Sequence, residues 1–143
     1  MSQRISIKNS DRKTYDLMLE LEAQAKFIQV NPKLLELIKI RASQINGCTY
    51  CIKMHTELAI KLGEDPNKIS ALSTWDKLSL FLEEEKAVLQ LTEEITNINL
   101  VGVTKSTYNS VVNIFGNKIT AQLIMQVVLI NSWNRIAMAT EMN

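Results

Sequence analysis

Both cysteines of the chain and its only histidine lie close together, at Cys48, Cys51 and His55. These positions are i, i+3 and i+7, so a helix would carry the three side chains on one face. Two thiols at this spacing can form and break a disulfide, and an imidazole one turn beyond the second thiol can act as its base. The spacing therefore predicts dithiol redox chemistry assisted by a general base.

The dipeptide Asn46-Gly47 directly before the first cysteine predicts the end of one helix and a tight turn into the next. Glycine accepts the left-handed conformation that a helix C-cap often needs. Cys48 would then lie near a helix N-terminus, where unpaired N–H groups and the helix dipole favour a thiolate. This local argument indicates Cys48 as the more acidic thiol.

Residues 36–55 follow the pattern E-L-x-x-x-R-A-S-x-x-N-G-C-x-Y-C-x-x-x-H. This pattern resembles the core motif of the alkylhydroperoxidase D-like, or carboxymuconolactone decarboxylase, family. A later run, residues 131–135, is similar to the N-x-W-N-R segment of its small members, so the resemblance spans nearly the whole chain from about residue 15. It implies an all-helical fold, homo-oligomers that are commonly trimers or hexamers, and reduction of hydroperoxides without a metal or organic cofactor.

The resemblance also implies a role for each residue of the site. Glu36 would orient His55 in a proton relay to Cys51, which would attack the peroxide, and Cys48 would resolve the sulfenic acid as a disulfide. This order differs from the local argument, and we take the family's order. A dithiol reductant, with a lipoylated protein as one candidate, would restore the pair by entering at Cys48, which we expect to be the more exposed sulfur. Some family members have a histidine where this chain has Tyr50, so Tyr50 is either a pocket wall or a hydrogen-bond donor.

Other interpretations of the cysteine pair remain. A structural zinc site needs four Cys or His ligands, and the chain supplies three, although Glu36 or water could complete a site. A structural disulfide closing so short a loop would contribute only about 2 kcal/mol. A lactone-acid decarboxylase of the same fold has no evident need for a dithiol, and a non-enzymatic redox sensor would use the disulfide as a switch.

For residues 133–135 we favour packing at a helix end over catalysis.

Composition limits the other functions. The 143 residues carry 16 basic and 15 acidic side chains, so no strong positive field favours nucleic acid or an anionic membrane as a partner. The first residues lack the apolar core of a signal peptide, and the longest apolar run, residues 123–130, is too short to span a bilayer. We therefore expect a cytoplasmic protein, in which a permanent disulfide is not expected.

The chain contains only four glycines and two prolines, and its apolar residues recur every three or four positions. This periodicity predicts one all-α domain over residues 1–143, with about six to seven helices. Residues 1–12 are expected to form a polar arm, and the region around Trp75 a loop. The apolar stripe of the first helix would consist of Leu17, Met18, Leu21, Ala25 and Ile28, and the last helix, apolar over more than one stripe, would supply a subunit interface. The expected helices cover residues 15–27, 31–46, 48–62, 67–72, 82–95, 104–115 and 117–139.

Overall fold

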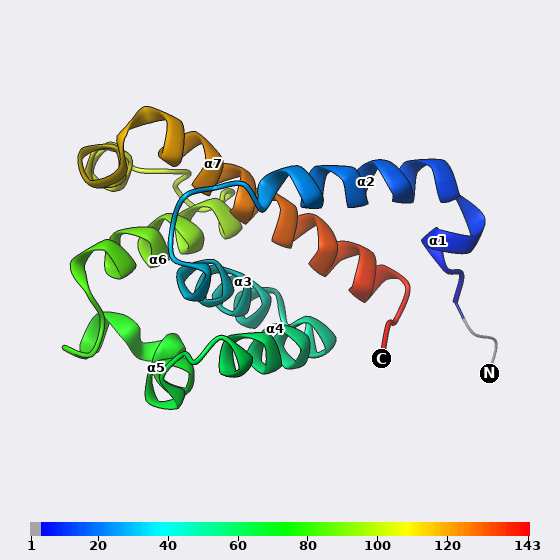
Figure 1. Ribbon diagram of the computed structural model, residues 1–143, viewed down its shortest axis with the longest axis horizontal. Helices are drawn as coiled ribbons and strands as arrows, with labels where there is room; N and C mark the ends of the chain where they lie inside the picture. Colours follow the sequence, from blue (N-terminus) through cyan, green and yellow to red (C-terminus); the bar gives the residue numbers. More distant parts are fainter. Residues whose placement is uncertain (1–3) are drawn as a thin grey trace.

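The computed structural model describes residues 4–143 and contains only helices and their connections over that range (Figure 1). The all-α prediction and the expected number of helices are therefore confirmed. The elements are α1 (Ile7–Ser10), α2 (Arg12–Ala25), α3 (Pro32–Asn46), α4 (Thr49–Lys61), α5 (Pro66–Ala71), the 3-10 helix η1 (Leu72–Lys77), α6 (Glu83–Thr96) and α7 (Lys105–Ala139).

The ends of α3 follow from local sequence. Asn31 caps the helix by accepting a hydrogen bond from the backbone N of Lys33 at 3.0 Å, and Pro32 occupies the first helical position. At the other end, Gly47 adopts a left-handed conformation with φ of 75°. A side chain at this position would be strained, so glycine stops α3 and turns the chain directly into α4.

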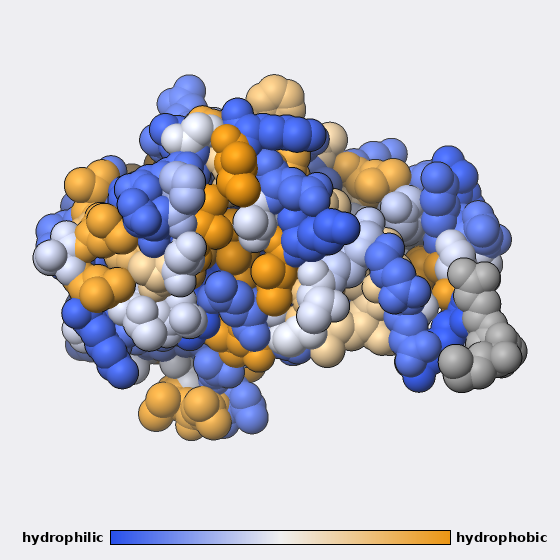
Figure 2. Space-filling model, turned by 90° about the horizontal axis from the view of Figure 1, so that it is seen from below, coloured by the Kyte–Doolittle hydropathy of each residue, from blue (hydrophilic) through white to orange (hydrophobic). Residues whose placement is uncertain are grey.

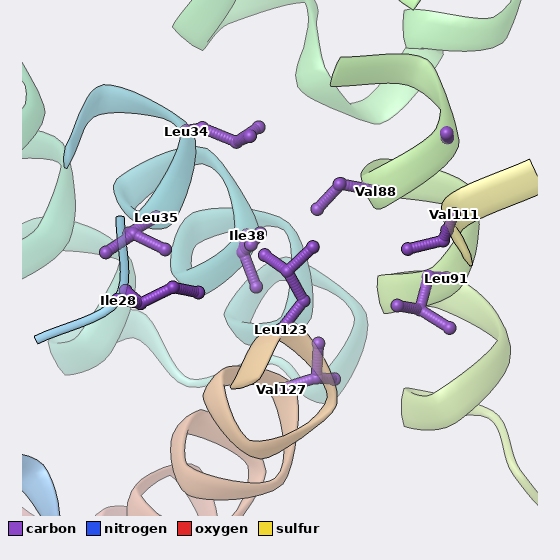
Figure 3. Packing of buried hydrophobic residues seen from close by; sticks show 10 residues of the cluster. Ile28, Leu34, Leu35, Ile38, Val88, Leu91, Val111, Leu123 and Val127 are labelled. Carbon is purple, nitrogen blue, oxygen red and sulfur yellow. The ribbon is translucent and has the colours of Figure 1, made fainter. Parts of the chain in front are cut away.

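Helix α3 lies at the centre of the fold and is buried on two faces. One face packs with α6 and α7 in an apolar cluster (Figure 3). Its other face, with Leu37 and Ile40, packs against α4, η1 and α6, where Trp75 and Phe81 are buried. The region around Trp75 is thus a 3-10 helix rather than the expected loop. The labelled members of the first cluster are Ile28, Leu34, Leu35, Ile38, Val88, Leu91, Val111, Leu123 and Val127.

Helix α7 is interrupted at Gly116, whose φ of 79° and ψ of 171° are not helical. The interruption coincides with the expected boundary between the helices at 104–115 and 117–139. By length and composition alone α7 could cross a bilayer. Leu123, Val127 and Ile130 of this helix are buried in the described structure.

The N-terminal region differs from the prediction in two ways. Residues 7–10 of the expected arm form α1, capped by Ser6, and α2 already begins at Arg12, capped by Asp11. Helix α2 has no fully buried residue, and Leu17 and Leu21 of the expected stripe are 56% and 40% exposed. The reason is that α2 packs against the short α1 and against α7 and extends away from the core (Figure 1).

Candidate active site

The two cysteines form a disulfide at the start of α4. Cys48 is the N-cap residue, and its Sγ atom accepts a hydrogen bond from the backbone N of Cys51 at 3.4 Å. Its own backbone N donates to the carbonyl of Ser43 at 3.0 Å, which fixes the turn after α3. The expected position of Cys48 at a helix N-terminus is therefore observed, and both sulfurs lie where the helix dipole stabilises a thiolate.

Glu36 and His55 lie together on the facing sides of α3 and α4. The Oε2 atom of Glu36 is 2.7 Å from Nδ1 of His55, and both residues are buried. His55 follows Cys51 by one helical turn, so the two side chains share a face of α4. The structure thus brings the acid and the base into contact on the helix that carries the cysteines; their catalytic roles stay a prediction.

Lys39 adds a positive charge to this pair, with its Nζ atom 3.5 Å from Oε1 of Glu36. Burial raises the pKa of the Glu36 carboxyl, but the hydrogen bond with His55 and the charge of Lys39 outweigh it and hold that pKa below its ordinary value. Glu36 is therefore ionised at neutral pH. An ionised Glu36 makes Nδ1 of His55 the hydrogen-bond donor and leaves Nε2 to accept a proton. Lys39 was not among the residues expected from the sequence.

A cavity of about 480 Å³ opens beside the disulfide. Cys48 lines it and Cys51 does not, although the two residues are almost equally buried, at 2% and 3% exposed. The cavity therefore gives access to Cys48 rather than to Cys51, as expected for the point at which a reductant enters, while Ala137 near the end of α7 packs against both cysteines. Tyr50 forms part of the wall of this cavity.

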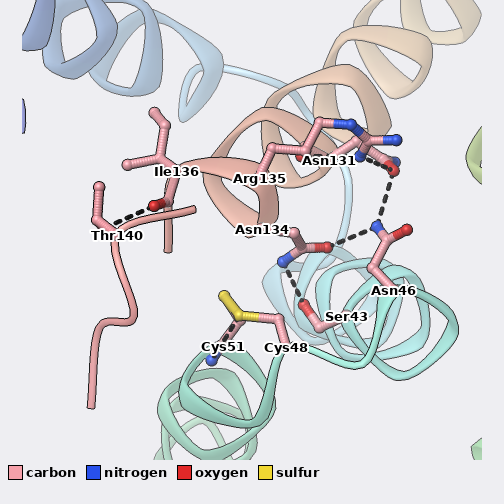
Figure 4. Close-up of a disulfide and its surroundings, with 9 residues drawn as sticks. All are labelled: Ser43, Asn46, Cys48, Cys51, Asn131, Asn134, Arg135, Ile136 and Thr140. Atoms are coloured by element: carbon pink, nitrogen blue, oxygen red, sulfur yellow. Dashed lines mark hydrogen bonds between the residues drawn. A yellow bond between two sulfur atoms is a disulfide. The ribbon is translucent and has the colours of Figure 1, made fainter. Parts of the chain in front are cut away.

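Four amide and hydroxyl side chains connect the end of α3 to α7 (Figure 4). Asn134 is fully buried; its Nδ2 donates to Oγ of Ser43 and its Oδ1 accepts from Nδ2 of Asn46, both at 2.9 Å. The same amide of Asn46 also donates to Oδ1 of Asn131 at 2.9 Å. The network holds the turn that carries Cys48. Ser43 and Asn46 belong to the first sequence motif and Asn134 to the later one. Their separation along the chain did not indicate that they contact one another.

The neighbouring residues of the late motif take part in packing. Trp133 donates from Nε1 to Glu22 at 2.9 Å and stacks edge-on with Tyr15, which attaches α2 to α7. Arg135 is exposed and donates to the carbonyl of Asn131 on its own helix. The interpretation of this segment as packing at a helix therefore agrees with the structure.

The described part of the chain contains no cluster of three His, Cys, Asp or Glu side chains that could hold a metal ion. Glu36 contacts His55 through a hydrogen bond, and both sulfurs are engaged in the disulfide. Within residues 4–143 the site thus consists of a disulfide with a hydrogen-bonded glutamate–histidine pair on α3 and α4.

Comparison with known proteins identifies the family. Residues 13–94 match the model of the carboxymuconolactone decarboxylase family. The chain belongs to this family. It is also similar to the uncharacterized protein YdfG of Bacillus subtilis, with 39% identity over 139 residues, 97% of this chain and 95% of that protein. The resemblance inferred from the sequence motif is therefore confirmed.

Two solved structures share the fold. One is an Agrobacterium tumefaciens protein of unknown function, described as a candidate antioxidant defence protein AhpD; it superposes with a TM-score of 0.94 at 25% identity and covers 99% of this chain and 97% of its own. The other is an uncharacterized peroxidase-related protein from Silicibacter, with a TM-score of 0.80 at 18% identity, covering 93% of this chain and 71% of its own. At that identity the second likeness concerns the fold alone.

Proposed function

We propose that the protein is a thiol-dependent peroxidase that reduces hydroperoxides through Cys51 and Cys48. The observation that carries this proposal is the Cys48–Cys51 disulfide at the start of α4, beside a buried acid–base pair. In this pair His55 lies on α4 and Glu36 on the neighbouring α3. A dithiol at a helix N-terminus supplies the thiolate, and a base one turn away can remove and return its proton.

The proposed reaction has three steps. The Cys51 thiolate attacks one peroxide oxygen, so that an S–O bond forms and the O–O bond breaks, and the leaving alkoxide takes the proton held on His55. Cys48 then attacks the sulfenic acid at Cys51, forming the disulfide and releasing water. Finally an external dithiol exchanges with the disulfide and leaves as its own disulfide, which restores both thiols.

A peroxide-consumption assay tests the proposal. Free thiols are counted in the reduced protein before and after one equivalent of cumene hydroperoxide, and dihydrolipoamide and excess peroxide are then added. We expect both thiols to be lost on addition of the peroxide and to be restored by dihydrolipoamide. Peroxide should then be consumed over many cycles. Thiols that oxidise once without turnover under any reductant would instead indicate a redox sensor, and two unreactive thiols would favour a decarboxylase.

We also propose that the protein forms homo-oligomers, as trimers or hexamers, in the cytoplasm. Apolar side chains gather across the middle of the face seen in Figure 2, on the side where α4 lies in Figure 1. Helix α4 and its C-cap residue carry Met54, Leu58 and Leu62 at intervals of four residues, and these side chains are 39%, 40% and 44% exposed. Such a stripe fits burial in an interface. Light scattering behind size-exclusion chromatography would measure the mass.

A further inference from the structure

The cavity beside Cys48 is bounded on one side by two chain segments that are far apart in sequence. Arg4, which precedes α1, donates from Nη1 to the carbonyl of Ala139 at 3.2 Å and pairs through Nη2 with Glu141 at 2.8 Å. Both Arg4 and residues 140–143 line the cavity together with Cys48. In Figure 4 the segment after Thr140 continues beside the end of α4 that holds the disulfide. We call Arg4 and residues 140–143 the strap.

The backbone directs the strap towards the cysteines. Among residues 4–143, Glu141 is the one non-glycine residue with a positive φ, at 52°. This turn lets the backbone N of Met142 donate to the carbonyl of Ala137 at 2.9 Å, and Ala137 packs on both cysteines. The strap is thus bonded to the end of α7 by the hydrogen bonds of Thr140 to Ile136 and of Met142 to Ala137, and Glu141 between them is also held by Arg4.

The strap has room to move. A second cavity, of about 340 Å³, lies on its other side against Tyr15 and Ile136 and is lined by the same strap residues. A segment with empty space on both sides can swing without displacing packed side chains. The ion pair that holds it is also weak, because the side chains of Arg4 and Glu141 are 53% and 63% exposed. Exposed pairs of this kind favour the bound arrangement by about fivefold or less.

We propose that Arg4 and Glu141 determine which dithiols reach the sulfur of Cys48, and so act as specificity-determining residues for the reductive half of the cycle. This inference rests on the proposed function. Cys48 is 2% exposed at the base of the cavity, so the broad surface of a folded protein does not contact its sulfur while the strap is closed. A small or slender dithiol enters through the cavity. Opening of the strap admits bulkier reductants.

The test measures access to Cys48 directly and needs no peroxide chemistry. In a Cys51→Ser background Cys48 is the only thiol in the chain. Its rate of labelling is measured with N-ethylmaleimide and with a maleimide carrying a 5 kDa polymer, at fixed pH. Arg4→Gln and Glu141→Gln are added separately and together. Arg12→Gln is the matched control, since Arg12 and Asp16 form a similarly exposed ion pair on α2 and neither residue lines the cavity.

We expect Arg4→Gln to raise the rate with the polymer reagent about two- to fivefold and the rate with the small reagent by less than about 1.5-fold. Glu141→Gln should have a similar or smaller effect, because the contact of Arg4 with Ala139 remains, and the double variant should add little. Sodium chloride at 1 M should reproduce the effect in the strap-intact protein. Equal effects on both reagents, or none on either, would overturn the proposal. If the labelling result is positive but the protein consumes no peroxide, the peroxidase function is rejected. The proposed role of the strap in access to Cys48 then still stands.

Discussion

The carboxylate of Glu36 lies 2.7 Å from Nδ1 of His55 and joins the central helix α3 to the helix that carries both cysteines. Because this carboxyl is ionised, the ring proton of a neutral His55 resides on Nδ1, and Nε2 is left free to accept a proton, which in the proposed cycle is that of the Cys51 thiol. The pair therefore sets both the orientation and the tautomer of the base. This relation makes the acid a positioning residue for the imidazole.

Replacing the carboxylate tests this role. Glu36→Gln keeps the shape of the side chain but removes its charge, and its amide can stabilise either tautomer of His55. We expect kcat/KM for peroxide to fall at least about tenfold, and His55→Gln to lower it about 100-fold or more. The measurement is steady-state peroxide consumption. The control is Glu57→Gln, an exposed carboxylate on α4, which should stay near the rate of the unaltered protein. Equal losses in Glu36→Gln and Glu57→Gln would contradict the relay.

Separate cysteine variants decide which sulfur attacks. If Cys51 is the nucleophile, Cys51→Ser has almost no activity, whereas Cys48→Ser reduces one equivalent of peroxide and stops. With no resolving thiol, Cys51 then proceeds to the sulfinic acid under excess peroxide. Rapid-mixing assays and intact-protein mass spectrometry follow both events. A single turnover in Cys51→Ser and none in Cys48→Ser would reverse the order.

The sequence predicted the parts of the fold that depend on local chemistry. Asn31, Pro32 and Gly47 bound α3 as expected, because caps and positive-φ turns depend on neighbouring residues. The break between residues 115 and 117 was also expected, and it lies at Gly116, whose φ is positive. The cysteines and histidine fell on one helix because their spacing is a property of the helix itself.

The parts that failed depend on tertiary contacts. The apolar spacing of Leu17 and Leu21 indicated an apolar stripe, but α2 packs against the short α1 and α7 and leaves these residues exposed. Periodicity shows which face of a helix is apolar and does not show what covers it. Likewise, the approach of Lys39 to Glu36, and of Asn134 to Ser43, joins groups whose meeting is decided by helix packing.

The buried amide network should contribute substantially to stability. Asn134→Ala removes the partner of the buried Ser43 hydroxyl and one of the two acceptors of Asn46. Since an unsatisfied buried polar group costs about 1–3 kcal/mol, we expect the free energy of unfolding to fall by about that amount. Urea denaturation measures it. Ser132→Ala on the same helix loses only an exposed hydrogen bond and should change stability by less than about 0.5 kcal/mol. A loss in Asn134→Ala no larger than in this control would show that the network is not a structural lock.

Acid should destabilise the protein in part through Glu36. The pKa of this carboxyl is lower in the folded protein than its ordinary value of 4.5, so the unfolded chain binds the proton more readily. Its stabilising contribution is therefore complete above about pH 4.5 and is lost as the pH falls through the lower, folded-state pKa. Glu94 shifts in the same direction, because hydrogen bonds from Thr107 and Thr104 outweigh the effect of its burial on the pKa.

Urea unfolding at a series of pH values between 5 and 3 isolates the contribution of Glu36. We expect the free energy of unfolding to decrease with falling pH, and Glu36→Gln to decrease less steeply, since the amide does not titrate. Lys39→Gln should also flatten the dependence, because loss of the positive charge 3.5 Å away raises the folded-state pKa of Glu36 towards its ordinary value. Glu57→Gln serves again as the exposed control. Parallel curves for the unaltered protein and Glu36→Gln would mean that the carboxyl has the same pKa in the folded and unfolded chain, which the contacts of His55 and Lys39 argue against.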